Sequence, residues 1–193
     1  MIYINNKTLC QQYLTLLYQN THGHHPTHHI SETYGEILEE GVNKLLSIVK
    51  PTANDVFADF GSGLGKVVLQ VFLQSAVKES CGIEIVPALH QQALAIAKRV
   101  QHDLPDCFTE RKLNFLLGNF LEIPVSTATI MLTGSPCYGP EMLHALANVI
   151  DKMPNIHTVL TLRPLCTLQR LSFKKAIRVE CSWDTALCYL YRR

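Results

Sequence analysis

Apolar and polar positions follow two different periods along the chain, and the period predicts where helices and strands form. Leu9, Tyr13 and Leu16 recur at helical spacing within residues 7–20, which predicts an amphipathic helix. Thr33 stands three residues before Glu36, which is the spacing of a capping box. We therefore expect a second helix to begin near Thr33 and to end before Pro51.

After Pro51, short apolar runs that predict strands alternate with longer amphipathic runs that predict helices. The expected strands are 55–60, 80–86, 113–118, 127–133 and 157–162, and the expected helices are 66–76, 87–101 and 140–153. Residues 176–183 and 185–193 are strand-like with almost nothing between them, which predicts a closing antiparallel hairpin. The sequence thus predicts a doubly wound α/β fold with a mainly parallel, seven-stranded sheet and helices on both faces.

Composition narrows the class of protein. The 193 residues are 47% hydrophobic and 17% charged, which is typical of one well-packed domain. The net charge of +1 argues against a sequence-independent grip on nucleic acid and against a polybasic membrane anchor. The seven cysteines are scattered without metal-ligand spacing, so we expect reduced thiols. We expect no signal peptide and no membrane span, hence a soluble cytoplasmic protein, with secretion to a host and the oligomeric state left open.

The chain divides into an N-terminal helix with a polar connection, residues 1–33, and a main domain, residues 34–193. The connection contains five histidines, but no nearby Cys, Asp or Glu completes a structural metal site, so we expect a solvated loop and no metal site. These histidines are His22, His24, His25, His28 and His29.

Three glycines follow the first strand of the main domain and precede its helix. Gly61, Gly63 and Gly65 leave backbone N–H groups and a helix N-terminus open to a ligand at the edge of the sheet. Lys66 stands where a dinucleotide fingerprint has its third glycine, which disfavours NAD and FAD, and a P-loop does not fit.

Acids at strand ends indicate which nucleotide-like ligand fits this turn. Glu84 ends the next strand and would accept hydrogen bonds from both hydroxyls of a ribose, and Asp59 suits the ammonium of a methionine moiety. Asn119 is placed to read an adenine edge and Phe120 to lie on its ring. Together these residues predict S-adenosylmethionine as the cofactor.

With these motifs the chain resembles the non-SET protein-lysine methyltransferases named for disruptor of telomeric silencing. The resemblance covers most of residues 31–191, through ETYGEI, VFADFGSGLGKVVLQV, CGIEIV, GNFLE, YGPE and VECSWDTALCY. It implies a class I methyltransferase fold and a loop, Tyr34, Gly35, Glu36 and Ile37, that closes over the cofactor. It also implies cofactor contacts from residues 57–66, Ser62 among them, and from Glu84, Asn119 and Phe120.

The segment TGSPCYGPE departs from the family. Ser135 stands where the family has an asparagine that orients methionine and the target amine, and Pro136 replaces an aromatic residue, while Tyr138 is retained. SPCY is also similar to the signature of enzymes that methylate exocyclic amines of bases, so a nucleic-acid methyltransferase is an alternative. A cofactor-binding interaction module that transfers no methyl group is a third interpretation.

Aromatic residues in the predicted hairpin complete the resemblance. Trp183 and Tyr189 match the lining of the family's lysine channel, although the segment between them is two residues shorter here. The implied reaction is in-line methyl transfer to a neutral lysine amine of a protein, with histone one candidate substrate and nucleic acid not expected. No strong base is required. The residues expected to shape the reacting site are Tyr34, Ser135, Tyr138, Trp183 and Tyr189; the cofactor set also includes Ser135.

Overall fold

The computed structural model of the chain describes residues 3–4, 6–19, 21, 36–134 and 136–193. The histidine-rich connection and the expected boundary between residues 33 and 34 lie outside these residues.

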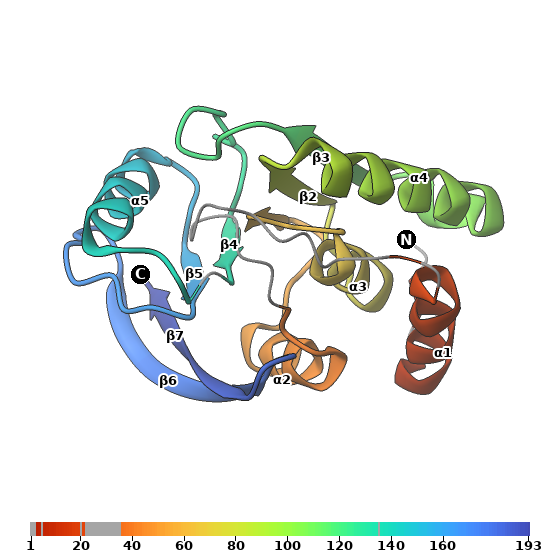
Figure 1. Cartoon of the computed structure of the whole chain (residues 1–193), viewed down its shortest axis with the longest axis horizontal. Coiled ribbons are helices and arrows are strands. Elements are labelled where there is room, and N and C mark those ends of the chain that lie inside the picture. The colour runs from red at the N-terminus through yellow and green to blue at the C-terminus, as the bar shows by residue number, and fades with distance from the viewer. Residues whose placement is uncertain (1–2, 5, 20, 22–35, 135) are drawn as a thin grey trace.

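Seven strands form one sheet, with helices on both faces (Figure 1). The helices are α1 (Lys7–Tyr18), α2 (Glu39–Val49), α3 (Lys66–Gln74), α4 (Pro87–Asp103) and α5 (Pro140–Lys152), with a short 3-10 helix at Pro105–Phe108. The strands are β1 (Val56–Phe60), β2 (Glu79–Glu84), β3 (Lys112–Leu117), β4 (Ile130–Thr133), β5 (Thr158–Thr161), β6 (Ser172–Glu180) and β7 (Thr185–Arg192). They lie in the order β3-β2-β1-β4-β5-β7-β6.

The first five strands are parallel, and the last two close the sheet in the antiparallel sense. β1 pairs in parallel with β2 and β4, and β7 lies antiparallel between β5 and β6. The order reverses between β1 and β4, which makes the carboxyl ends of these two strands the topological switch point. The predicted doubly wound fold with its C-terminal hairpin is confirmed.

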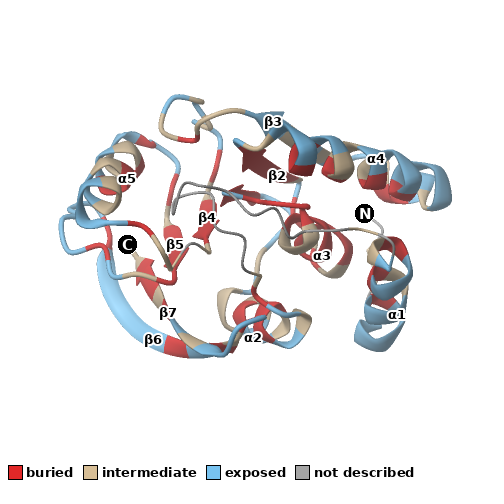
Figure 2. Cartoon of the chain, in the orientation of Figure 1, coloured by how far each residue is buried: buried red, intermediate tan, exposed pale blue. Residues whose placement is uncertain are grey.

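Side chains of the central strands alternate between two hydrophobic cores. Phe57 of β1 packs with α2 and α3, whereas Ala58 and Phe60 pack with α5 on the other face. Helix α1 adds an outer layer, because Cys10 and Leu14 pack against α3 and α4. Burial is concentrated in the central strands, while β6 and the outer sides of α1 and α4 are largely exposed (Figure 2).

The second helix begins later than its sequence pattern predicts. Its first residue is Glu39, and Leu38 occupies the N-cap without a side-chain hydrogen bond. Glu36, the expected partner in a capping box, lies outside the helix with its carboxylate on Lys66, and Thr33 is outside the described residues. Because the helix starts three residues after Glu36, this capping-box prediction is wrong.

The hairpin is also displaced from its predicted position. β6 begins at Ser172 and ends at Glu180, so Trp183 lies in the turn rather than in a strand. Its first residues, Phe173 and Lys174 among them, are exposed because β6 is an edge strand. Because its exposed positions do not alternate between apolar and polar residues, the hydrophobic pattern of the sequence did not predict the first part of β6.

In the described part of the chain, no helix is both long and apolar enough to cross a membrane.

Candidate functional site

The glycine turn lies at the switch point and is held against the end of β2. Gly61 and Ser62 both donate their backbone N–H to the Ile83 carbonyl at 2.9 Å, and Gly65 donates to the Ser62 carbonyl at 2.8 Å. The φ angles of Gly61, Gly63 and Gly65 are 86°, 54° and 79°, a region that strongly favours glycine. The turn therefore presents backbone, and no side chain of its glycines, at this edge.

The glycine turn packs closely against β2 and β3, where two glycines leave no space for a side chain. A Cβ added at Gly82 of β2 would lie 2.5 Å from Ser62 Oγ and 2.8 Å from the ring of Phe115. A Cβ at Gly65 would overlap the same Phe115 ring. Gly82 and Phe115 thus support the turn from β2 and β3, and sequence reasoning did not identify them.

Two carboxylates are buried beside the turn. Glu84 is 7% exposed; its oxygens accept hydrogen bonds from the N–H groups of Gly63 at 2.7 Å and Val86 at 2.9 Å. Asp59 is 3% exposed at the end of β1. Burial, and secondly the nearby Glu84 charge, raise the pKa of the Asp59 carboxyl well above its usual value. A cation or hydrogen-bond donors from a ligand would offset this cost.

Glu36 connects the turn to two distant elements. Its carboxylate lies 2.6 Å from the Lys66 ammonium at the start of α3. Its backbone N–H donates to Ser182 Oγ at 3.1 Å, and its carbonyl accepts from the Ser182 N–H at 2.8 Å. Ile37 forms a bridge with Cys181 and is 6% exposed in the core. The segment before α2 is therefore fastened to both α3 and the hairpin turn.

Aromatic rings cover the other side of the site. Phe120 is 8% exposed, stacks on Phe60 at 5.3 Å between centroids and lies 5.8 Å from the Tyr138 ring. The Tyr138 hydroxyl lies 3.3 Å from the position of a Cβ on Gly61, so it reaches the glycine turn. Asn119 binds within its own turn, where its amide contacts the Leu121 N–H and Glu122.

The loop after β4 is anchored from the end of β5. Arg163 donates from Nη1 to the Pro136 carbonyl at 2.9 Å, two residues before Tyr138. The Arg163 carbonyl in turn accepts a hydrogen bond from the Thr161 hydroxyl at 3.0 Å. This link fixes the segment that carries Tyr138.

The hairpin aromatics occupy unequal positions. Tyr189 pairs in register with Thr161, at the carboxyl end of β5, and packs against the core that contains Tyr138. Trp183 is 44% exposed in the turn, next to Ser182. The fold thus brings Asp59, Glu84 and Tyr138 to the glycine turn and sets Tyr189 at the same edge.

Some expected site residues lie outside the described part of the chain: Tyr34, Gly35 and Ser135. Other contacts were not predicted, namely those of Tyr18, Arg163 and Ser182. Tyr18 donates to the Leu64 carbonyl at 3.2 Å across 46 positions of sequence, and no local pattern signals such a contact. Among the described residues, no three His, Cys, Asp or Glu side chains are grouped to hold a metal ion.

Solved structures share this architecture. A putative RNA methyltransferase from Pyrococcus horikoshii aligns over 96% of this chain and 98% of its own, with a TM-score of 0.63 and 14% identity. At this identity the likeness shows the fold alone. The class I methyltransferase fold that the resemblance implied is confirmed.

Sequence relatives are more specific. Over 162 residues the chain is 30% identical to a Dictyostelium discoideum protein described as "Histone-lysine N-methyltransferase, H3 lysine-79 specific", a match to 77% of this chain but 8% of that relative. A "Protein-lysine N-methyltransferase" from Saccharolobus islandicus is 27% identical over 93 residues, 48% of this chain and 53% of its own length. The chain thus spans only part of each relative. Residues 24–180 match the family described as "Histone methylation protein DOT1", and the chain belongs to that family.

Proposed function

We propose that the protein is an S-adenosylmethionine-dependent methyltransferase that methylates a lysine amine of a protein. One observation carries the proposal: in a chain of this family, buried Asp59 and Glu84 flank a glycine turn at the switch point of the sheet. Open α/β sheets bind their ligands at this place.

The described residues fit the cofactor. The Asp59 carboxylate is buried and close to a second acid, so the ammonium of the methionine moiety would stabilise its charged form. Glu84 accepts two backbone hydrogen bonds, and since a carboxylate has about four lone pairs it retains capacity for two ribose hydroxyls. When bound, the cofactor supplies an electrophilic methyl group on a sulfonium.

The chain's own contribution is to hold the amine in line and to keep it neutral. An aromatic, partly dry channel disfavours an ammonium and lowers the pKa of the amine. Tyr138 and Tyr189 support this role, because both pack in the core beside the site edge. Trp183 lies in the adjacent turn, from which it would cover a bound peptide. We also propose contributions to the cofactor and amine sites from four further residues: Tyr34, Ser135, Asn119 and Phe120.

Relatives support a protein substrate. The matching proteins from Dictyostelium and Saccharolobus are described as acting on lysine, in histone H3 and in proteins respectively. For the base-methylating alternative, the carbonyl of Pro136 would help to hold a planar amine. That carbonyl already accepts a hydrogen bond from Arg163, and no other described contact favours this alternative.

Transfer of a labelled methyl group tests the proposal. Purified protein and tritiated S-adenosylmethionine are incubated in separate reactions with histones, nucleosomes, DNA or cell lysate. The labelled product of each reaction is identified by mass spectrometry. Label on lysine is the expected result. Label on DNA would overturn the lysine assignment, and cofactor binding without label on any substrate would favour the interaction module.

A further inference from the structure

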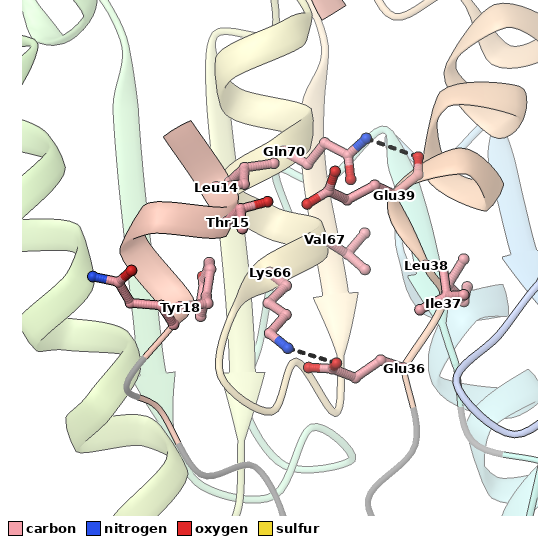
Figure 3. A pocket seen from close by; sticks show the side chains of 11 residues that line it. Leu14, Thr15, Tyr18, Glu36, Ile37, Leu38, Glu39, Lys66, Val67 and Gln70 are labelled. Atoms are coloured by element: carbon pink, nitrogen blue, oxygen red, sulfur yellow. Dashed lines mark hydrogen bonds and ion pairs between the residues drawn. The ribbon is translucent and has the colours of Figure 1, made fainter. Parts of the chain in front are cut away.

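A crevice that borders the glycine turn lies over the outer side of α3. It has a volume of about 290 Å³ and is bounded by α1, by the segment that leads into α2, and by α3 itself (Figure 3). Leu14 and Tyr18 enter it from α1, Ile37 from the segment before α2, and Val67 from α3. Its walls are thus mainly apolar, with one aromatic ring.

The charges in this crevice are unbalanced. Lys66 is paired with Glu36, and its ammonium also lies 5.3 Å from the centroid of the Tyr18 ring. Glu39, which lines the same crevice, has no such cation: its Oε2 atom is buried and meets no hydrogen-bond donor in the described part of the chain. Among the described residues that line the cavity there are thus two acids, Glu36 and Glu39, and one base, Lys66.

The fixed surroundings of Glu39 do not supply the missing donor. The nearby Gln70 amide is 2% exposed, and its nitrogen donates to the Glu39 backbone carbonyl at 3.0 Å and to Asn43 and Gln74. Burial, and secondly the charge of Glu40, raise the pKa of the Glu39 carboxyl, although Lys66 opposes this. A buried carboxylate oxygen without a donor is costly, so a cation that enters the crevice would gain a strong hydrogen bond.

The shape selects the kind of cation. Apolar side chains such as Leu14, Ile37 and Val67 suit an unbranched aliphatic stem. A single unpaired oxygen suits the compact ammonium of lysine better than the two-pronged guanidinium of arginine.

We propose that this crevice binds a lysine side chain of the protein substrate other than the lysine that is methylated. The assignment to a substrate rests on the proposed function. Glu36 connects the hairpin turn with the crevice. Its carboxylate lines the crevice, and its backbone is hydrogen-bonded to Ser182, which precedes Trp183 in the turn. A polypeptide that crosses the hairpin turn therefore reaches the crevice along the segment before α2.

Binding of a small probe tests the site without any methyl transfer. The full chain, with 13C-labelled methyl groups, is titrated with n-butylammonium and, as the uncharged match, with n-butanol. We expect saturable NMR shifts at the Leu14, Ile37 and Val67 methyl groups with the amine, at least about tenfold tighter than with the alcohol. Equal binding of both probes, or shifts elsewhere only, would overturn the proposal.

Variants then assign the cation to Glu39. Glu39→Gln keeps the shape and should weaken n-butylammonium binding about tenfold or more. Asp106→Asn, a change of an exposed acid that does not line the crevice, should leave it unchanged. Thr15→Phe, at an exposed position on the rim, should block entry without a change of charge. Retained binding in both Glu39→Gln and Thr15→Phe would overturn the assignment.

Failure of this site and failure of the proposed function give different results. If lysine label is found and the crevice binds no amine, the function stands and the inference falls. If the amine binds but no substrate is labelled on lysine, the cation site stands without its assigned partner. With both active, Glu39→Gln should raise KM for a peptide with two lysines and leave KM unchanged for the same peptide with the second lysine replaced by norleucine.

Discussion

The Nζ atom of Lys66 lies 2.6 Å from Glu36 Oε2, although 30 positions separate the two residues in sequence. This pair joins the first residue of α3 to the segment before α2, at the border of the glycine turn. Because the two side chains are 37% and 19% exposed, solvent screens only part of their attraction.

A double-mutant cycle with Lys66→Met and Glu36→Gln should therefore give a coupling free energy of about 0.5–1 kcal/mol in chemical unfolding. The Arg99 and Asp103 pair, at 3.6 Å and with Arg99 59% exposed, is the matched control and should couple more weakly. Equal coupling free energies in the two pairs would contradict the expectation that the ion pair between α3 and the segment before α2 stabilises the fold more than an exposed pair does.

Replacement of Asp59 should have opposite effects on stability and on cofactor binding. The folded pKa of Asp59 exceeds its unfolded value, so the folded state loses stability as pH rises from about 4 toward the folded pKa. At neutral pH, Asp59→Asn should therefore raise the free energy of unfolding, because it removes the cost of the buried carboxylate. Calorimetry should show weaker binding of S-adenosylhomocysteine.

Asp106→Asn, at an exposed position in the 3-10 helix, is the control for Asp59→Asn and should change neither quantity. If Asp59→Asn and Glu84→Gln both bind S-adenosylhomocysteine as tightly as the unchanged protein, the cofactor assignment fails.

Tyr138 combines packing with a hydroxyl that reaches the glycine turn. Tyr138→Phe keeps the ring, so we expect unfolding to change by less than about 1 kcal/mol and kcat for methyl transfer to fall about tenfold. Tyr138→Ala should destabilise by about 3–5 kcal/mol, because the ring is only 5% exposed. Unchanged kcat in Tyr138→Phe would restrict the residue to packing.

Gly82 is required for space rather than for a special backbone conformation. In Gly82→Ala the new methyl group would meet Ser62 and Phe115, which should cost about 1–3 kcal/mol of stability and disturb the glycine turn. Gly134→Ala, where no described atom outside the adjacent residues lies within 4 Å of the added Cβ, should be close to neutral. Thermal unfolding measures both, and a neutral Gly82→Ala would show that the turn adapts.

Asp55 stabilises the opposite edge of the sheet. Burial opposes its ionisation, but hydrogen bonds from the Thr52 N–H, the Thr129 and Thr52 hydroxyls and His157 lower the pKa of its carboxyl. A folded pKa below the unfolded value means stability that is present above about pH 4 and lost as pH falls toward the folded pKa. Asp55→Asn should cost about 1–3 kcal/mol at neutral pH and flatten the acid limb of a stability profile.

Much of this architecture follows from local pattern. Buried central strands such as β1 and β4 were predictable because both faces are covered and most of each run is apolar. Asp59 and Glu84 could be placed together because parallel strands end at one edge. The early residues of β6 could not be predicted, since an exposed edge strand lacks the hydrophobic alternation that identifies strands.

The contacts that fasten the site lacked a sequence signal. Glu36 had the spacing of a helix cap, yet its side chain binds Lys66 and its backbone binds Ser182. Such choices depend on which elements the fold brings together. A capping box is a local preference that an ion pair from another helix can override.

The bond from Glu36 to Ser182 spans 146 positions of sequence. The ribosome must therefore synthesise the turn between β6 and β7 before the segment ahead of α2 can form its hydrogen bonds to Ser182. Until then the nascent chain can build β1, the glycine turn and α3, together with the β2 and β3 residues that support the turn, but it lacks the contacts between Glu36 and Ser182. The glycine turn and its flanking elements are thus synthesised early, whereas the contact that fastens the segment before α2 forms only after the hairpin turn has been synthesised.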